Sequence, residues 1–143
     1  MIIGIDMGAS ATKLAALEDG KLVLTHYEPG RGGDIAALCG KLGLDLSRAR
    51  AVGLAGLSAA NARLGVPGPE PVRVTEPEAI GRGAVLLTGR DDVIVASVGT
   101  GTAFVHAKEG VFTHLCGTGV GAGTLTGLAQ KGLGMSDMEA FDA

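Results

Sequence analysis

The sequence has few aromatic residues, few cysteines and no concentration of positive charge. Its 143 residues include three phenylalanines, one tyrosine and no tryptophan, so it lacks the stacking surfaces that bind single-stranded nucleic acid. Fifteen acidic and twelve basic side chains give a net charge of −3, and no cluster of Lys or Arg suggests a partner of nucleic-acid type. Two cysteines, neither in a CxxC pair, exclude a disulfide framework and favour a reducing, cytoplasmic setting.

Long hydrophobic runs are also lacking. The longest, residues 51–57, is far shorter than the roughly 20 residues that cross a bilayer, and the N-terminus MIIGID has no basic segment of the signal-peptide type. We therefore expect no membrane partner. The length suits one compact domain.

Glycine, in contrast, is abundant. The chain holds 25 glycines among its 143 residues, whereas glycine makes up about 7% of average proteins. Because 46% of the residues are apolar, this composition is typical of a globular chain with many tight turns.

Strand and helix signals alternate along the chain. Asp19-Gly20 and Glu109-Gly110 are typical of two-residue hairpin turns, and apolar strands over residues 1–6 and 92–97 each end at a glycine turn. The order β-β-β-α-β-α-β-α-β-β-β-α predicts an α/β fold with a mixed sheet. The two hairpin turns join expected strands over residues 11–18 and 21–26, and over 102–108 and 111–115. The remaining expected elements are strands over residues 51–55 and 72–75, helices over 35–42, 59–64, 77–87 and from about 123, and the opening of a further helix over 135–143.

The first candidate site follows the first strand. Asp6 ends that strand, Gly8 turns the chain, and Ser10, Thr12 and Lys13 begin the next strand. Such a turn offers backbone N–H groups, hydroxyls and one cation to phosphate oxygens, and a carboxylate there suits Mg²⁺. The alternative is an ordinary hairpin with a polar turn, but the combined spacing favours phosphate binding.

Two further glycine loops are candidates for anion binding. Residues 98–102 (VGTGT) follow an apolar strand, and residues 117–124 (GTGVGAGT) open a helix, where free N–H groups attract negative charge. A glycine-rich hairpin is an equal alternative for the first loop. The second loop formally matches GxGxx(G/A), but it follows a hairpin and opens no βαβ unit, so a Rossmann site is rejected.

The segment Thr75-Glu76-Pro77-Glu78 holds a candidate general base. A residue before proline is disfavoured in helical conformation, so we expect Glu76 at the N-cap with Pro77 as the first helical residue. The alternative, which these residues alone favour, is helix-start chemistry, because Thr75 and Glu78 have capping-box spacing. The helix dipole favours an ionised carboxylate at this end, as a general base requires.

Together these motifs resemble type II pantothenate kinase, within the superfamily of actin, sugar kinases and heat-shock ATPases. The resemblance covers nearly the whole chain and is weakest over residues 27–71. It rests on Gly4-Ile-Asp6-x-Gly8-x-Ser10-x-x-Lys13, Glu76-x-Glu78-Ala79-x-x-x-Gly83, Val98-Gly-Thr-Gly-Thr102 and the glycine loop that ends at Leu128.

The resemblance implies an RNase H-like lobe, in which helices flank a mixed β-sheet, as in one lobe of an actin-like ATPase. It implies a cytoplasmic, homodimeric enzyme that uses ATP and Mg²⁺ to phosphorylate pantothenate, the first step of coenzyme A biosynthesis. Family members are about twice as long, and their second lobe supplies the rest of the adenine pocket and the dimer contacts. Residues 1–143 are therefore expected to be an N-terminal lobe, truncated before that second lobe and inactive alone.

The resemblance also assigns roles to residues. Glu76 matches the catalytic base that takes the proton from the pantothenate hydroxyl, and Mg²⁺ would bridge the phosphates near Asp6. The residues that would contact ATP are Gly8, Ala9, Ser10, Ala11, Thr12, Lys13, Leu14, Ala15, Thr100, Ala122, Gly123, Thr124, Leu125 and Thr126.

Two positions depart from the family pattern. Ala122 stands where members often have glycine, and its Cβ is harmless only at negative φ. His114 stands where some members have an arginine that contacts the pantetheine or acyl-CoA ligand, so feedback by acyl-CoA is not implied for this chain.

Three alternatives to a pantothenate kinase stay open. One is a sugar-type kinase. Another is the ATPase activator of acyl-CoA dehydratases, although such a protein needs cysteines for an iron–sulfur cluster and Cys116 offers too few ligands. The third is a non-catalytic lobe that binds nucleotide weakly or not at all.

Overall fold

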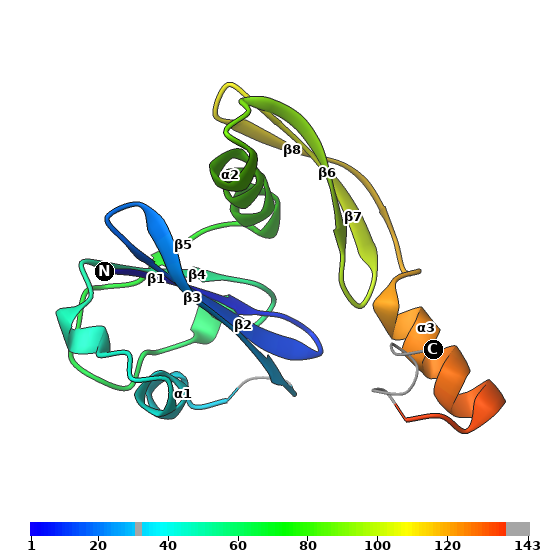
Figure 1. The fold of residues 1–143 in the computed structure, drawn as a ribbon, viewed down its shortest axis with the longest axis horizontal. Coiled ribbons are helices and arrows are strands. Elements are labelled where there is room, and N and C mark those ends of the chain that lie inside the picture. The colour runs from blue at the N-terminus through cyan, green and yellow to red at the C-terminus, as the bar shows by residue number, and fades with distance from the viewer. Residues whose placement is uncertain (31–32, 137–143) are drawn as a thin grey trace. The chain divides into compact units, whose positions relative to one another are not determined.

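The computed structural model describes residues 1–30 and 33–136, and the chain divides into two compact units, Met1–Glu76 and Pro77–Ala143. Each unit combines a β-sheet with helices (Figure 1). The first unit contains β1 (Ile2–Met7), β2 (Ala11–Glu18), β3 (Lys21–Pro29), α1 (Ile35–Lys41), β4 (Ala51–Ala55) and β5 (Val72–Arg73). The second contains most of α2 (Glu76–Thr88), together with β6 (Asp92–Val98), β7 (Thr102–Lys108), β8 (Val111–Thr118) and α3 (Ala122–Leu128).

The sheet of the first unit has five strands in the order β3-β2-β1-β4-β5. Strand β1 pairs antiparallel with β2 and parallel with β4, so the predicted mixed sheet is confirmed. The antiparallel register places Asp6 opposite Lys13, and the parallel pairing brings the ends of β1 and β4 to the same edge. The candidate residues of the first glycine turn therefore lie at that edge.

The first unit has a continuous apolar core. Ile3 and Ile5 alternate with less buried residues along β1 and pack in one cluster with Val52 and Leu54 of β4. Helix α1 covers this cluster through Ile35 and Cys39, which are spaced at the helical period. Burial raises the pKa of the Cys39 thiol, as expected for a group that loses water around its charged form.

The sheet of the second unit has three antiparallel strands in the order β6-β7-β8. Helix α2 packs on it at Gly81, where an added Cβ would collide with the ring of Phe112. The guanidinium carbon of Arg82 lies 5.2 Å from the centroid of the same ring, within the range of a cation–π contact. These contacts attach α2 to β8.

The hairpin predictions are confirmed. Asp19 and Gly20 both have positive φ, at 48° and 77°, and Glu109 and Gly110 have φ of 50° and 79°. Two consecutive positive values are the requirement of a type I′ turn, whose twist matches that of the flanking strands.

Several element bounds differ from the prediction. Helix α2 begins at Glu76 and not at Pro77: the clash before proline disfavours helical geometry without forbidding it, and terminal helix assignments vary by a residue or two. The helix expected over residues 59–64 is a 3₁₀ turn at Ala59–Asn61, and β5 is only two residues long. Helix α3 continues as a π-helix over Ala129–Leu133. From residue 137 onward, the helix expected at 135–143 lies outside the described residues.

None of the described helices is both long enough and apolar enough to cross a membrane.

Candidate functional site

Asp6 and Lys13 form an ion pair at the edge of the first sheet. The Lys13 Nζ lies 2.9 Å from the Asp6 Oδ2, because the two residues are direct partners across β1 and β2. The side chains are 51% and 37% exposed for Lys13 and Asp6. An ion pair in such contact with water contributes only about 0.2–1 kcal/mol, so a stronger ligand can replace either partner.

The turn beside this pair is tight and its backbone is accessible. A Cβ on Gly8 would lie 3.1 Å from the Ala11 carbonyl oxygen and 3.9 Å from the Lys13 Nζ. Ala9 and Ser10 at the tip of the turn are exposed. The turn thus presents backbone groups next to a cation, the arrangement that binds phosphate oxygens.

The predicted nucleotide-binding stretch from Gly8 to Ala15 divides between the surface and the interior. Ala11, Thr12 and Leu14 have 4%, 4% and 3% of their surface exposed, and Leu14 belongs to the apolar core. These three residues therefore offer little surface of their own to a ligand. Lys13 is the charged side chain of the stretch that reaches solvent.

Gly56, which the sequence analysis missed, lies against Asp6. Its φ is +93°, and a Cβ there would lie 2.6 Å from the Asp6 Oδ1 and from the Met7 carbonyl oxygen. The Ser58 N–H donates to that same carbonyl oxygen at 3.4 Å. The available signal was a glycine directly after the apolar strand 51–55, since parallel strands β1 and β4 end at the same edge.

The two glycine loops of the second unit pack against each other. The Ala122 N–H donates to the Gly99 carbonyl oxygen at 2.8 Å, and the Thr102 hydroxyl donates to the Val120 carbonyl oxygen at 2.8 Å. A Cβ on Gly121 would lie 2.7 Å from the carbonyl oxygens of Gly99 and Gly101. The two loops, predicted separately, therefore form one continuous candidate site.

This second site is rich in hydroxyl groups and carries no charge. The loop at residues 117–126 has a glycine at every second position from 117 to 123. Together with residues 99–102 it contains five threonines and no Asp, Glu, Lys or Arg. Ala122 is the first residue of α3, and the described non-glycine residues with positive φ are Asp19 and Glu109. Ala122 is therefore not among the residues with positive φ, so its Cβ causes no backbone strain.

The first turn of α2 carries the two candidate carboxylates. Glu78 accepts a hydrogen bond from the Arg82 Nε at 2.8 Å, and Arg82 in turn stacks on Phe112. Glu76 is two residues earlier, which on an α-helix turns its side chain about 200° away from that of Glu78. The Glu78 carboxylate is thus bound by Arg82, whose guanidinium lies over the ring of Phe112 in β8.

Of the predicted site residues, the structure brings Asp6 and Lys13 together in the first unit. In the second unit it brings Thr100 close to Ala122 and Gly123, since a Cβ on Gly123 would lie 2.9 Å from the Thr100 Cγ2. Along the chain, Glu76 is the last residue of the first unit. Among the described residues, no three His, Cys, Asp or Glu side chains are grouped as a metal site. One carboxylate, Asp6, fits Mg²⁺, which is commonly held by one or two carboxylates together with water and substrate phosphates.

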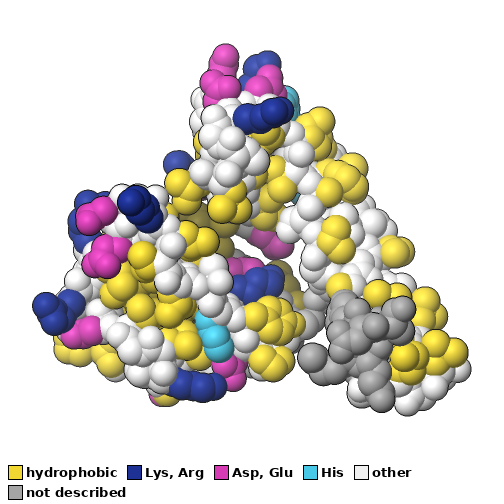
Figure 2. Space-filling view, in the orientation of Figure 1, with side chains coloured by type: hydrophobic (Ala, Val, Ile, Leu, Met, Phe, Trp, Pro, Cys, Tyr) yellow, Lys and Arg dark blue, Asp and Glu magenta, His cyan; other side chains and the backbone are white. Residues whose placement is uncertain are grey.

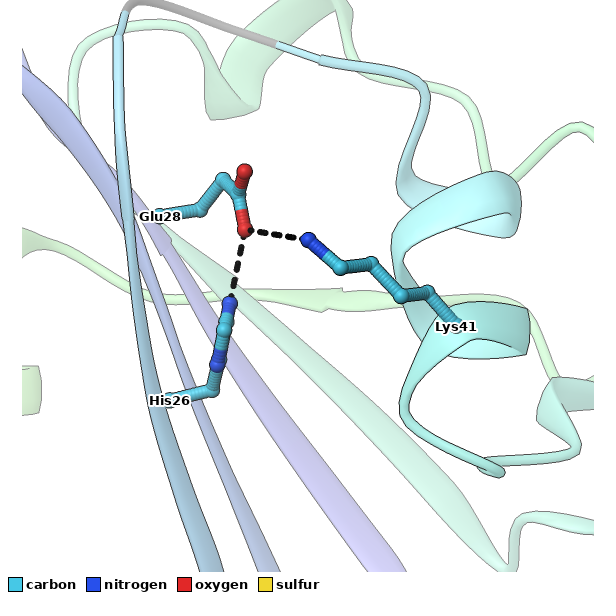
Figure 3. A network of polar contacts seen from close by, with 3 residues as sticks. All are labelled: His26, Glu28 and Lys41. Carbon is cyan, nitrogen blue, oxygen red and sulfur yellow. Dashed lines mark hydrogen bonds and ion pairs between the residues drawn. The ribbon is translucent and has the colours of Figure 1, made fainter.

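A polar cluster that the sequence did not indicate connects β3 with α1 (Figure 3). The Glu28 Oε2 lies 2.8 Å from the His26 Nε2 and 3.5 Å from the Lys41 Nζ. The hydrogen bond from His26, and then the charge of Lys41, lower the pKa of Glu28. Glu28 and Lys41 also line a cavity of about 370 Å³ beside α1.

A matching cluster lies in the second unit. Asp92 contacts the Lys108 Nζ at 2.8 Å and the His106 Nε2 at 2.7 Å. The hydrogen bond from Lys108, followed by that from His106, lowers the pKa of Asp92, and Asp92 raises the pKa of Lys108. Both clusters place one carboxylate between a histidine and a lysine.

Comparisons with known proteins identify the fold. No family model matches the chain, and no curated protein matches it by sequence. Component A of the (R)-2-hydroxyglutaryl-CoA dehydratase of Acidaminococcus fermentans is similar in structure, with a TM-score of 0.72, 17% identity, and coverage of 96% of this chain and 56% of that one. The activator of the 2-hydroxyisocaproyl-CoA dehydratase of Clostridium difficile, with bound ADPNP, is also similar in structure. Its TM-score is 0.71 and its sequence identity 18%, and the match covers 96% of this chain and 54% of that one.

A third similar structure is the putative N-acetylglucosamine kinase of Porphyromonas gingivalis, with a TM-score of 0.57, 19% identity, and coverage of 93% of this chain and 57% of that one. The chain spans between 54% and 57% of the length of these three proteins. The similarity confirms the predicted fold class: the chain has the mixed α/β architecture of an actin-like ATPase lobe.

Proposed function

We propose that the chain is the nucleotide-binding part of a kinase that transfers phosphate from ATP to pantothenate. The observation that carries the proposal is the Asp6–Lys13 pair beside the Gly8 turn. It provides a cation for phosphate and a carboxylate for Mg²⁺ at one sheet edge. The bound ADPNP in one similar structure and the similarity to a putative N-acetylglucosamine kinase support a nucleotide ligand for this fold.

In this proposal, the charge of Lys13 binds the phosphates and the backbone N–H groups of the Gly8 turn orient them. Asp6 would hold Mg²⁺, which neutralises charge on the transferred phosphoryl group. The resemblance to type II pantothenate kinase assigns further nucleotide contacts to Thr100 and to residues 122–126 of the second unit. Positioning and charge stabilisation supply most of the catalysis in reactions of this class.

Glu76 is the proposed general base. It accepts the proton of the pantothenate hydroxyl as the hydroxyl oxygen bonds to the γ-phosphorus and ADP leaves. Glu78 is the weaker candidate, because Arg82 already binds its carboxylate at 2.8 Å. The resemblance of the segment 76–83 to type II pantothenate kinase supports the same choice.

A second candidate is an ATPase without a small-molecule acceptor. The higher TM-scores of the two dehydratase proteins, 0.72 and 0.71 against 0.57 for the sugar kinase, favour it. The exposed Cys116 and the buried Cys39 are too few for an iron–sulfur cluster held within this chain. ATP hydrolysis that does not respond to pantothenate would support this candidate.

Substitution of the two carboxylates tests the proposal. We expect Glu76→Gln to lower the kcat of pantothenate phosphorylation by roughly 10²–10⁴-fold in the natural protein at its full length, because the base is removed. Glu78→Gln, the matched control, should have a modest effect on kcat and act through the helix start. The measurement is the rate of 4'-phosphopantothenate formation, with ATP affinity as a second readout that neither change should alter.

The opposite result would contradict this assignment. If Glu78→Gln abolished turnover and Glu76→Gln stayed active, Glu78 would be the base and Glu76 a helix-start residue.

A further inference from the structure

A second cavity of the first unit contains charged groups that the proposed function does not use. It has a volume of about 730 Å³ and is lined by residues 62–71 and by Arg73 of β5. Its charged side chains are two arginines, Arg63 and Arg73, and one glutamate, Glu70. The wall therefore has a net positive charge, which favours an anionic ligand.

The two arginines of this cavity have different surroundings. The Arg73 Nε donates to the Ala59 carbonyl oxygen at 3.2 Å, and its Nη2 donates to the Ala62 carbonyl oxygen at 3.0 Å. The Nη1 of the same guanidinium lies 3.8 Å from the Glu70 Oε1. Arg63 is exposed, and none of the ion pairs between described residues includes it. The protein thus binds the Arg73 guanidinium itself and leaves that of Arg63 to a ligand.

The cavity lies close along the chain to the proposed general base. Strand β5 pairs parallel with β4, and the Val74 N–H donates to the Leu54 carbonyl oxygen at 2.9 Å, so the pairing continues after Arg73. Glu76 follows three residues after Arg73 in the same unit, which limits the separation of their Cα atoms to roughly 10 Å. Extended pantothenate spans roughly 9 Å from its hydroxyl oxygen to its carboxyl carbon at similar bond lengths. An acceptor with its hydroxyl at Glu76 is long enough to reach the cavity with its other end.

We propose that Arg63 binds the carboxylate of the acceptor and makes the protein select acceptors that end in a negatively charged group. The inference rests on the proposed function, because the acceptor is the molecule phosphorylated there. A guanidinium binds a carboxylate through two parallel charge-assisted hydrogen bonds. An amide lacks the negative charge, so pantothenate should bind more tightly than its amides, of which pantetheine is one.

Calorimetric titration of the natural protein at its full length with pantothenate and with its primary amide tests this selection. We expect the unsubstituted protein to bind pantothenate about tenfold more tightly than the amide, a difference typical of one hydrogen bond to a charged group. Arg63→Gln should bind the two ligands within about twofold of each other, because the cation is absent. Its affinity for the amide should stay that of the unsubstituted protein.

Arg90→Gln is the matched control. Arg90 is also exposed and also outside the ion pairs of the described residues, but it belongs to the second unit. This variant should keep the tenfold preference for pantothenate. Thermal unfolding of each variant verifies that the fold persists.

Three outcomes overturn the inference: equal affinity of the unsubstituted protein for the acid and the amide, a preference for the acid that persists in Arg63→Gln, or no binding of pantothenate. If the first or second occurs while 4'-phosphopantothenate forms from ATP, the proposed function stands without the role of Arg63. Failure of the proposed function looks different. If Arg63→Gln abolishes the preference but no 4'-phosphopantothenate forms, the kinase assignment fails and the carboxylate site at Arg63 stands.

Discussion

The two units are built in the same order but carry different chemistry. In the first, β1 leads through a glycine turn to β2, through a type I′ turn to β3, and then to α1; in the second, β6, β7, β8 and α3 follow each other through the same two kinds of turn. The first glycine turn lies beside an Asp–Lys pair, whereas the second is surrounded by threonines and has no charged residue. The same strand order thus supports one charged and one neutral site.

Packing differs as much as charge. Twelve buried residues form one core in the first unit, and β1 has a partner strand on both sides. In the second unit, β6 pairs with β7 alone among the described strands, and its residues Ile94 and Val98 are 67% and 63% exposed. Figure 2 shows hydrophobic side chains at the surface in this part of the chain. The difference indicates that stability depends mainly on the first unit.

Truncation of one leucine in each unit tests this difference most strongly. Leu54 is fully buried in β4 and Leu115 is 48% exposed in β8. Leu54→Ala should lower the free energy of unfolding by about 2–5 kcal/mol, because it removes apolar contacts and leaves a cavity. Leu115→Ala should lower it by less than about 1 kcal/mol, since partly exposed positions lose little on truncation.

Urea denaturation followed by circular dichroism measures both values. Equal losses for the two variants would mean that the second unit is packed as tightly in solution as the first.

The charge difference predicts unequal contributions to nucleotide affinity. Lys13→Ala removes a charge-assisted contact to phosphate and should weaken ATP binding by about 1.5–3 kcal/mol. Thr100→Ala removes one neutral donor and should weaken it by about 0.5–1.5 kcal/mol. Isothermal titration calorimetry in Mg²⁺ compares the variants, and an unchanged affinity in Lys13→Ala would show that the first turn is only a hairpin.

The sequence predicted features that depend on local chemistry. Both type I′ turns were predictable, because Asp19-Gly20 and Glu109-Gly110 contain the residues that tolerate positive φ. The pairing of Asp6 with Lys13 was foreseeable as a shared site, since a short glycine turn between two strands brings these residues opposite each other. The apolar, β-branched runs that end at glycine turns located β1 and β6.

Features that depend on contacts distant in sequence were not predictable. The position of Gly56 against Asp6 follows from the parallel pairing of β1 with β4, which no local pattern encodes. The packing of the loop at Gly99 on the loop at Gly121 depends on the β7–β8 register. The start of α2 at Glu76 is a local feature that differs from the prediction, because the steric preference before proline disfavours helical geometry without forbidding it.

Substitution of Glu28 or Asp92, the two carboxylates that each lie between a histidine and a lysine, should have the smallest effect of the changes considered. Because one lies in each unit, a single experiment on thermal stability compares the two units. The pKa values of Glu28 and Asp92 are lowered by their partners. A carboxylate whose pKa is lower in the folded than in the unfolded state stabilises the fold above the ordinary carboxyl range, near pH 4, and this contribution is lost as the pH falls through the folded-state value. Glu28→Gln and Asp92→Asn should therefore each lower the Tm slightly at pH 7, and the difference from the unsubstituted protein should disappear in strong acid.

We expect Glu28→Gln to have the larger effect of the two. Glu28 connects β3 with α1 through Lys41, so its loss loosens a helix that covers the core, whereas Asp92 connects only the neighbouring strands β6 and β7. Differential scanning calorimetry between pH 7 and pH 3 measures the two differences. In a Lys41→Met background, the effect of Glu28→Gln should be smaller and that of Asp92→Asn unchanged, because Lys41 contacts Glu28 and does not contact Asp92. A Tm difference that stays constant across this pH range would instead assign the effect of Glu28 to side-chain packing, and the carboxylate charge would not be its cause.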